Sequence, residues 1–291
     1  MSLPMPLGVT AVMLPELDFE QQIALCSELG VTHYCVRPRI IPEDAVGKPY
    51  SNWGNHAFDL TPKRLVAEAS TIKKQIEDAG LTVFGSVPAV MVDAPVDELK
   101  LHFEGAAAVG AGRVRVSPRV YPKGPFHYET RLEEEIECFV KAVELAKPYE
   151  QKIVMETHVG SFVSGPGLAL NLCKAFSPDE IGVIFDIANF NFEGALQPNL
   201  AIAVLKDYID HIHIGGMQIN NTGYDANGFA KRQREMAPIT ESNLYIPDWI
   251  KALVEAEVKV PMLIEDYTLN KPGALRLREA SKAIRRVFES L

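Results

Sequence analysis

Residues 152–186 read KIVMETHVGSFVSGPGLALNLCKAFSPDEIGVIFD, and this stretch is the key to the fold. Two apolar runs, 153–155 and 183–185, end at Glu156 and Asp186, and a helix-like segment at 167–176 separates them. Near-continuous apolar runs are typical of parallel strands that are covered on both faces. The stretch therefore predicts one β-α-β unit in which each strand ends in a carboxylate.

The same alternation continues in both directions along the chain. Glycines such as Gly30, Gly80 and Gly110 follow the helical segments, which is the usual signal at a helix C-terminus. Eight consecutive units predict an α/β fold of the (β/α)8 TIM-barrel type, with a parallel eight-stranded barrel and outer helices. No linker divides the chain, so we expect a single domain over 1–291. The expected strands are 8–14, 32–36, 82–87, 113–117, 152–156, 182–186, 211–214 and 260–265, and the expected helices are 18–29, 62–79, 96–109, 132–148, 167–176, 200–208, 247–256 and 274–291.

Composition excludes several classes of protein. The chain is 47% hydrophobic and 23% charged, which is ordinary for a globular protein. Its formal net charge of −9 is poorly suited to a nucleic-acid backbone, so we expect no nucleic-acid partner. The N-terminus lacks a basic and apolar leader, and no apolar run of membrane-spanning length occurs, so we expect a cytoplasmic protein with no membrane partner. The four cysteines form no C-x-x-C pair and are expected to be buried thiols.

Ionisable residues interrupt four consecutive apolar strands at or near their C-terminal ends. These residues are Glu156, Asp186, His213 and Glu265. A carboxylate at such a position is costly to bury unless it is paired or bound to a metal. Because the ends of these strands meet at the mouth of a barrel, we expect the four side chains to hold one divalent metal ion. The oxygen-rich set suits Mn²⁺ or Mg²⁺. We place Mn²⁺ first because it tolerates imidazole, and Co²⁺ and Zn²⁺ stay open.

On these residues the chain resembles the xylose isomerase-like TIM-barrel superfamily, in its sugar phosphate isomerase/epimerase branch, which includes D-tagatose 3-epimerase, hydroxypyruvate isomerase and inosose dehydratase. The resemblance matches Glu156, Asp186, His213 and Glu265 to the family's metal ligands. It implies that the metal holds the carbonyl and hydroxyl oxygens of a sugar-like substrate while Glu156 and Glu265 transfer protons. A cation beside an enediolate oxygen offsets negative charge, and a nearby carboxylate can remove the proton next to the carbonyl. We therefore expect a metal-dependent isomerase or epimerase of carbohydrate metabolism, acting on a ketose, ketose phosphate or related polyol.

Three further functions stay open beside this one. A metal-dependent lyase or dehydratase of the inosose dehydratase type would begin with the same proton abstraction. A phosphoesterase of the endonuclease IV type needs many histidine ligands, whereas this chain has seven histidines in total and few at strand ends. A non-catalytic binding module would leave four intact ligands without a purpose.

Other residues are candidates for contact with the substrate. Relatives often carry histidine three residues after the strand-6 aspartate, where this chain has Asn189, and Gly215 and Gly216 replace a common lysine–aspartate pair. These changes alter the substrate shell and leave the metal ligands intact. His158 shares the inward face of Glu156. The expected substrate-binding residues are His158, Asn189, Arg37, Arg119 and Trp53.

Two long connections, 38–61 and 215–245, leave the C-terminal ends of strands, where loops act as lids or specificity elements in barrels. The second holds the basic residues Lys231, Arg232 and Arg234, which we expect to be solvated, with phosphate binding as the alternative. His211 is expected to be buried and hydrogen-bonded, and not to bind metal. A homo-oligomer, as a dimer or a tetramer, stays open.

Overall fold

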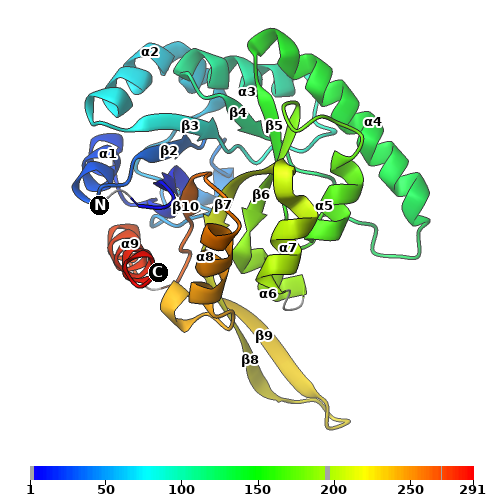
Figure 1. Cartoon of the computed structure of the whole chain (residues 1–291). Helices are drawn as coiled ribbons and strands as arrows, with labels where there is room; N and C mark the ends of the chain where they lie inside the picture. Colours follow the sequence, from blue (N-terminus) through cyan, green and yellow to red (C-terminus); the bar gives the residue numbers. More distant parts are fainter. Residues whose placement is uncertain (1–2, 194–196, 270) are drawn as a thin grey trace.

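Eight parallel strands close into a barrel in this computed structural model, which describes residues 3–193, 197–269 and 271–291 (Figure 1). The order around the barrel is β1-β10-β7-β6-β5-β4-β3-β2, and every neighbouring pair is parallel. The predicted (β/α)8 TIM-barrel fold is therefore confirmed. The barrel strands are β1 (Leu7–Thr10), β2 (His33–Val36), β3 (Thr82–Ser86), β4 (Arg113–Arg115), β5 (Lys152–Glu156), β6 (Ile181–Asp186), β7 (Ile209–Ile214) and β10 (Met262–Ile264).

Helices surround the barrel and bury their apolar faces against it (Figure 1). One of them, α6, directly continues β6 and is absent from the sequence prediction. Short 3₁₀ turns occupy Ala11–Met13, Glu43–Ala45, Lys147–Tyr149, Lys206–Tyr208 and Ile239–Glu241. The helices are α1 (Phe19–Glu28), α2 (Pro62–Asp78), α3 (Val96–Val109), α4 (Tyr128–Ala146), α5 (Pro166–Cys173), α6 (Ile187–Glu193), α7 (Pro198–Leu205), α8 (Ile246–Glu255) and α9 (Gly273–Glu289).

Local signals explain where several helices begin and end. At the start of α1, Asp18 accepts a hydrogen bond from the backbone of Gln21, and the Gln21 side chain accepts one from the backbone of Asp18. At the start of α2, Thr61 accepts a hydrogen bond from the backbone of Arg64. Gly110 ends α3 with a φ of 80°, a left-handed conformation that glycine adopts without a steric cost.

The core is one large apolar cluster between the barrel and its helices, with a smaller one inside the barrel. Cys26, Cys35 and Cys173 are buried as predicted, whereas Cys138 is half-buried on α4. Within the described part of the chain, every helix is too short or too polar to cross a membrane.

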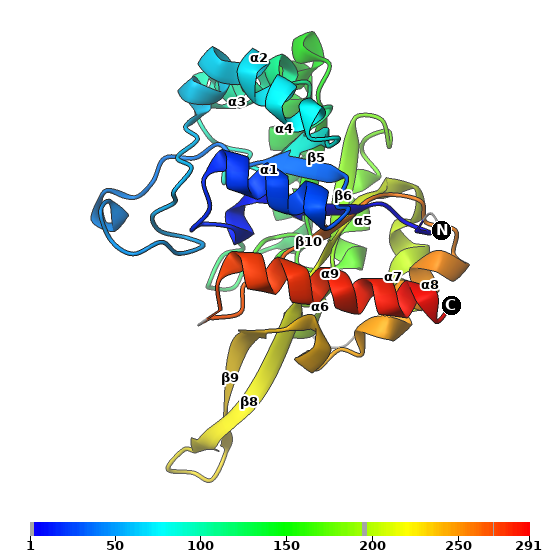
Figure 2. The same ribbon diagram turned by 90° about the vertical axis from the view of Figure 1, so that its left-hand side faces the viewer.

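The connection after β7 differs most from the sequence prediction. Residues 215–245 lack an apolar period, and we expect no strands there, but the structure contains an antiparallel hairpin of β8 (Gly216–Tyr224) and β9 (Ala230–Ala237). The hairpin extends away from the barrel in both views (Figures 1 and 2), and the loop between β2 and α2 projects in Figure 2. Only the base of the hairpin is buried, at Gly216, Met217 and Ala237. Backbone pairing mainly defines the rest, where the side chains are mostly polar and exposed on both faces, as predicted for Lys231, Arg232 and Arg234.

Candidate metal centre

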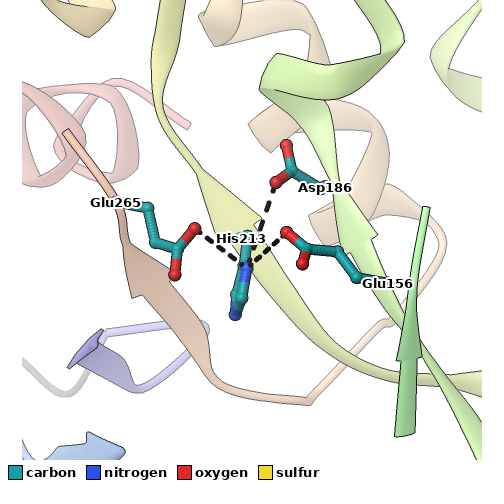
Figure 3. A group of neighbouring side chains, drawn as sticks. All are labelled: Glu156, Asp186, His213 and Glu265. Atoms are coloured by element: carbon teal, nitrogen blue, oxygen red, sulfur yellow. Dashed lines mark hydrogen bonds and ion pairs between the residues drawn. The ribbon is translucent and has the colours of Figure 1, made fainter. Parts of the chain in front are cut away.

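Four side chains from the ends of consecutive barrel strands meet at the mouth of the barrel. Glu156 ends β5, Asp186 ends β6, His213 is the second-last residue of β7, and Glu265 follows β10. Asp186 and His213 are direct partners in the strand register. One ligand atom from each of the four residues lies within 4.8 Å of the others. The structure therefore brings together the residues that the sequence predicts as metal ligands (Figure 3).

The imidazole Nδ1 atom of His213 lies at the centre of this group. It is 3.1 Å from Glu265 Oε2, 3.3 Å from Glu156 Oε1 and 4.0 Å from Asp186 Oδ2. Ligand atoms about 2.1 Å from one ion are roughly 3.0–3.4 Å from each other, so the first two distances already suit a shared ion. Glu156 and Glu265 approach His213 from opposite sides (Figure 3).

Backbone contacts fix the carboxylates in place. Asp186 Oδ1 accepts a hydrogen bond of 2.8 Å from the backbone N of Asn189, so that helix α6 orients this side chain and leaves Oδ2 toward His213. Gly215 allows the close approach of β7 to Glu265, because a Cβ atom at position 215 would lie 2.3 Å from the Glu265 carbonyl oxygen. This crowding gives a physical reason for glycine where relatives carry a side chain.

The charges of the four groups are strongly coupled. Burial would raise the pKa of Glu156, but the Arg115 guanidinium and His213 hold it well below its usual range. Burial and the charge of Glu156 raise the pKa of Asp186 well above its usual range. Burial would lower the pKa of His213, but Glu265 and Glu156 raise it to about 10. Without a metal, protons on His213 and Asp186 thus take the place of a cation, and metal binding would release them.

A cavity of about 250 Å³ opens onto the three carboxylates of this group. Four of the five predicted substrate-binding residues, Arg37, Trp53, His158 and Asn189, line it together with Glu156, Asp186 and Glu265. The His158 Nδ1 atom donates to the Val159 carbonyl over 2.8 Å, which leaves Nε2 as its second nitrogen. Arg37 is held over the ring of Trp53, with its guanidinium carbon 5.1 Å from the ring centroid.

The structure does not bring Arg119 to this cavity. Its Nε atom lies 2.9 Å from Glu135 Oε1 and its Nη2 atom 3.3 Å from Glu134 Oε2, and both glutamates belong to α4. Glu135 is fully buried, so it holds the guanidinium at the outer rim. The prediction that Arg119 contacts the substrate is therefore not supported by its position, because a nearer carboxylate already occupies it.

Two residues that sequence reasoning missed belong to the site. The Arg115 Nη2 atom lies 2.9 Å from Glu156 Oε2, and Tyr267 lines the cavity while it packs on Trp53 with ring centroids 5.0 Å apart. Arg115 has a signal in the sequence: in the short strand Arg113–Arg115, alternation gives both arginines the same face. Tyr267 follows Glu265 by two residues, but it lies beyond the end of β10, where strand alternation has no force.

A second buried cluster of charges lies deeper in the barrel. Asp210 is 2.9 Å from Arg113 Nε, 3.0 Å from Lys152 Nζ and 2.8 Å from His211 Nδ1. The register between β6 and β7 shifts at this point, since Val183 pairs with Ile209 and Ile184 pairs with His211. His211 is buried and hydrogen-bonded, as predicted.

Comparison with known proteins places these features in a family. A sequence profile of the xylose isomerase-like TIM barrel family matches residues 44–287. No curated protein matches the sequence.

Solved structures match over nearly the whole chain, but at low sequence identity. The probable 3-DHS dehydratase AsbF from Bacillus anthracis has a TM-score of 0.72 at 14% identity, covering 97% of this chain and 99% of its own. The IOLI protein with a bound zinc atom has a TM-score of 0.71 at 15% identity, with 98% and 99% covered. A xylose isomerase-like TIM barrel protein from Mycobacterium smegmatis in complex with magnesium has a TM-score of 0.67 at 15% identity, with 100% and 99% covered. An L-ribulose 3-epimerase also matches, with a TM-score of 0.69 at 14% identity, over 98% of this chain and 95% of its own.

Proposed function

Because the chain belongs to the xylose isomerase-like TIM barrel family, we propose that it is a divalent-metal-dependent isomerase or epimerase of a ketose, ketose phosphate or related polyol. The observation that carries this proposal is the group formed by Glu156, Asp186, His213 and Glu265, in which the two glutamates approach from opposite sides. Structural neighbours that include an epimerase, a dehydratase and metal-bound proteins support an enzyme of this general kind.

The donor set fits one divalent ion. Three carboxylates and one imidazole suit Mn²⁺, our first choice, and also Mg²⁺, Co²⁺ or Zn²⁺. When all three carboxylates are ionised they repel one another, and a cation would relieve that repulsion and replace the protons that His213 and Asp186 otherwise hold. A bound ion would polarise the carbonyl of the substrate and offset the charge of an enediolate.

Proton transfer is assigned to the two glutamates. One carboxylate removes the proton from the carbon next to the carbonyl, and the other returns a proton. Because the two glutamates lie on opposite sides of His213, the returned proton inverts the carbon centre or relocates the carbonyl. Arg115 keeps Glu156 ionised, and therefore able to act as a base. His158, Asn189, Arg37 and Trp53 would contact the hydroxyl groups and carbon face of the substrate.

A dehydratase is the second candidate. It shares the first proton abstraction and differs in the loss of a hydroxyl group from the neighbouring carbon. The structural likeness to a probable 3-DHS dehydratase supports this candidate.

Proton NMR in D₂O separates these reactions. The metal-loaded protein is incubated with ketoses, ketose phosphates and inososes, each with and without a chelator. Metal-dependent deuterium at a carbon next to the carbonyl, with a new isomer or epimer, is the expected result. A deoxy or dicarbonyl product would indicate the dehydratase, and absence of exchange across the panel would contradict both reactions.

We also propose that residues 1–291 act as one catalytic domain, because the barrel strands come from residues 7–264 and α9 closes the outer layer. A dimer or tetramer would be seen by size-exclusion chromatography with light scattering, and a single barrel mass would contradict it.

A further inference from the structure

A second cavity, of about 920 Å³, adjoins the metal cavity. The two share the side chains of Trp53, Met236 and Tyr267 in their walls. Three segments that are far apart in sequence line the second cavity: residues 50–53 of the loop after β2, residues 233–236 of β9, and residues 267–269, 271 and 272 after β10. A ligand that reaches the metal centre therefore has a large, partly open cavity beside it.

The sizes of the two cavities indicate a substrate of two parts. Sites for small molecules usually have volumes of about 300–1,000 Å³, so the inner cavity of about 250 Å³ suits one compact unit. The outer cavity, of about 920 Å³, lies at the upper end of that range. A single ketose at the metal centre would leave the outer cavity without a function.

The walls of the outer cavity suit a neutral ring. Tyr50 and Trp53 are about half exposed, and Leu269 is largely exposed, so all three offer apolar surface to a ligand in the cavity. Aromatic rings of this kind pack against the carbon–hydrogen faces of sugars, and tyrosine adds a polar group. Trp53 is held in position, because Tyr267 packs against it and its carbonyl accepts a 3.1 Å hydrogen bond from Arg39.

The charges around the cavity argue against a phosphate. The guanidinium of Arg276 is already bound to the carbonyls of Asp266 and Met13, and to Asn52 Oδ1 at 2.9 Å. Lys271 lies 2.9 Å from Glu279. The same walls contain Arg234, which already has an interaction partner, and the carboxylates of Glu16 and Glu235, which would repel a phosphate.

We propose that the substrate is a keto sugar joined through a glycosidic bond to a second, neutral sugar ring, and that Tyr50, Asn52, Trp53 and Leu269 form a distal subsite for that ring. The keto sugar occupies the metal cavity, and the second ring lies on the outer side of Trp53. This inference rests on the proposed function for its chemistry, but the distal subsite can be tested by binding alone.

One ketose in several attached forms tests the subsite. Solvent deuterium exchange is measured for D-fructose, for its glucosyl and galactosyl derivatives maltulose, isomaltulose and lactulose, and for fructose 6-phosphate. At least one of the disaccharides is expected to have a kcat/KM about tenfold above that of fructose, since one well-packed aromatic contact is worth roughly this factor. Tyr50→Ala is expected to remove most of that preference through KM. Tyr245→Ala, an exposed tyrosine outside both cavities, is the matched control and should keep it.

Binding without turnover distinguishes the subsite from the reaction. Maltitol and sorbitol lack the carbonyl, and their binding is followed by tryptophan fluorescence. Tighter binding of maltitol than sorbitol, lost in Tyr50→Ala, would support the subsite even if no substrate were turned over, in which case only the proposed function would fail. Two outcomes would overturn the subsite while leaving the proposed function in place. The first is equal kcat/KM for fructose and all three disaccharides together with equal binding of maltitol and sorbitol. The second is a preference for fructose 6-phosphate over every disaccharide.

Discussion

The interior of the barrel holds two buried groups of charges that differ in their balance. In the deeper group, a single carboxylate, Asp210, faces two permanent cations, Arg113 and Lys152, within 3.0 Å. At the mouth, three carboxylates surround the imidazole of His213, Arg115 pairs with one of them, and Arg37 lines the adjoining cavity. The two groups are neighbours, since the rings of His211 and His213 lie with their centroids 5.1 Å apart.

The difference shows what each group is built for. Buried charges are stable when partners neutralise them, and the deeper group contains its own partners. The group at the mouth has three carboxylates beside a cavity, and without a metal it is neutralised in part by protons on His213 and Asp186, which an external cation can replace. The balance of charge thus separates a structural cluster from a metal site more clearly than burial does, because both groups are buried.

The largest effect is expected on catalysis at the mouth. Glu156→Gln should lower turnover about 10²–10⁴-fold or more, because it removes a proton-transfer group and a metal ligand. Activity is measured by deuterium exchange, and Glu255→Gln, an exposed glutamate of α8, is the control that should retain it. Activity close to wild type in Glu156→Gln would contradict its role as an acid/base residue.

The next largest effect is expected on stability in the deeper group. Asp210→Asn should lower the free energy of unfolding by about 3 kcal/mol, because it leaves Arg113 and Lys152 without their buried counter-charge. Urea unfolding measures this loss. Asp207→Asn, at an exposed position three residues earlier, should change stability by less than about 0.5 kcal/mol. An equal loss in both variants would mean that the charge balance of the deeper group is not what stabilises it.

Metal binding should stabilise the protein through the group at the mouth and not through the deeper group. Mn²⁺ at about one hundred times its dissociation constant should raise the free energy of unfolding of the wild type by about 2.7 kcal/mol. Asp186→Asn should lose this gain, whereas Asp210→Asn should keep it on a lower baseline. Thermal unfolding with and without Mn²⁺ measures both effects, and an unchanged gain in Asp186→Asn would remove that residue from the ligand set.

The smallest effect, counted per pH unit, concerns the dependence of stability on pH, and here the two histidines have opposite signs. In the metal-free protein, burial lowers the pKa of His213, but Glu265 and Glu156 outweigh this and raise it to about 10. The resulting stability is fully present below about pH 6.5 and is lost as the pH rises toward 10, by about 1 kcal/mol per pH unit. Burial lowers the pKa of His211 to about 4, so its contribution is lost as the pH falls from about 6.5 toward 4.

Urea unfolding of chelator-treated protein between pH 5 and 9 measures these two slopes. The variant His213→Gln should flatten the alkaline slope and leave the acid slope in place. Mn²⁺ should also reduce the alkaline slope, because the ion replaces the proton on His213. An alkaline slope that is unaffected by His213→Gln would contradict the assignment.

Much of the fold and the centre of the site could be predicted from the sequence. Parallel strands that are covered on both faces are apolar throughout, so a carboxylate or imidazole near the end of such a strand stands out. Glu156, Asp186, His213 and Glu265 are visible for this reason, and the barrel topology brings consecutive strand ends to one place. The hairpin was not predictable, because its strands are buried only at their base and therefore have no apolar period.

The sequence by itself determined the order of the barrel strands and of the helices between them, and the four metal-ligand candidates. Apolar periodicity and the ends of strands can be recognised from residues that are neighbours in sequence. Only the tertiary structure decided which long side chains complete the site. Arg115 lies against Glu156, whereas Arg119 lies against Glu135, although both arginines come from the same segment of chain. Arginine side chains are long and bind the nearest buried carboxylate, and which carboxylate is nearest depends on packing between elements distant in sequence. The second cavity likewise depends on the tertiary structure, because its walls come from three segments that only the closed barrel brings together.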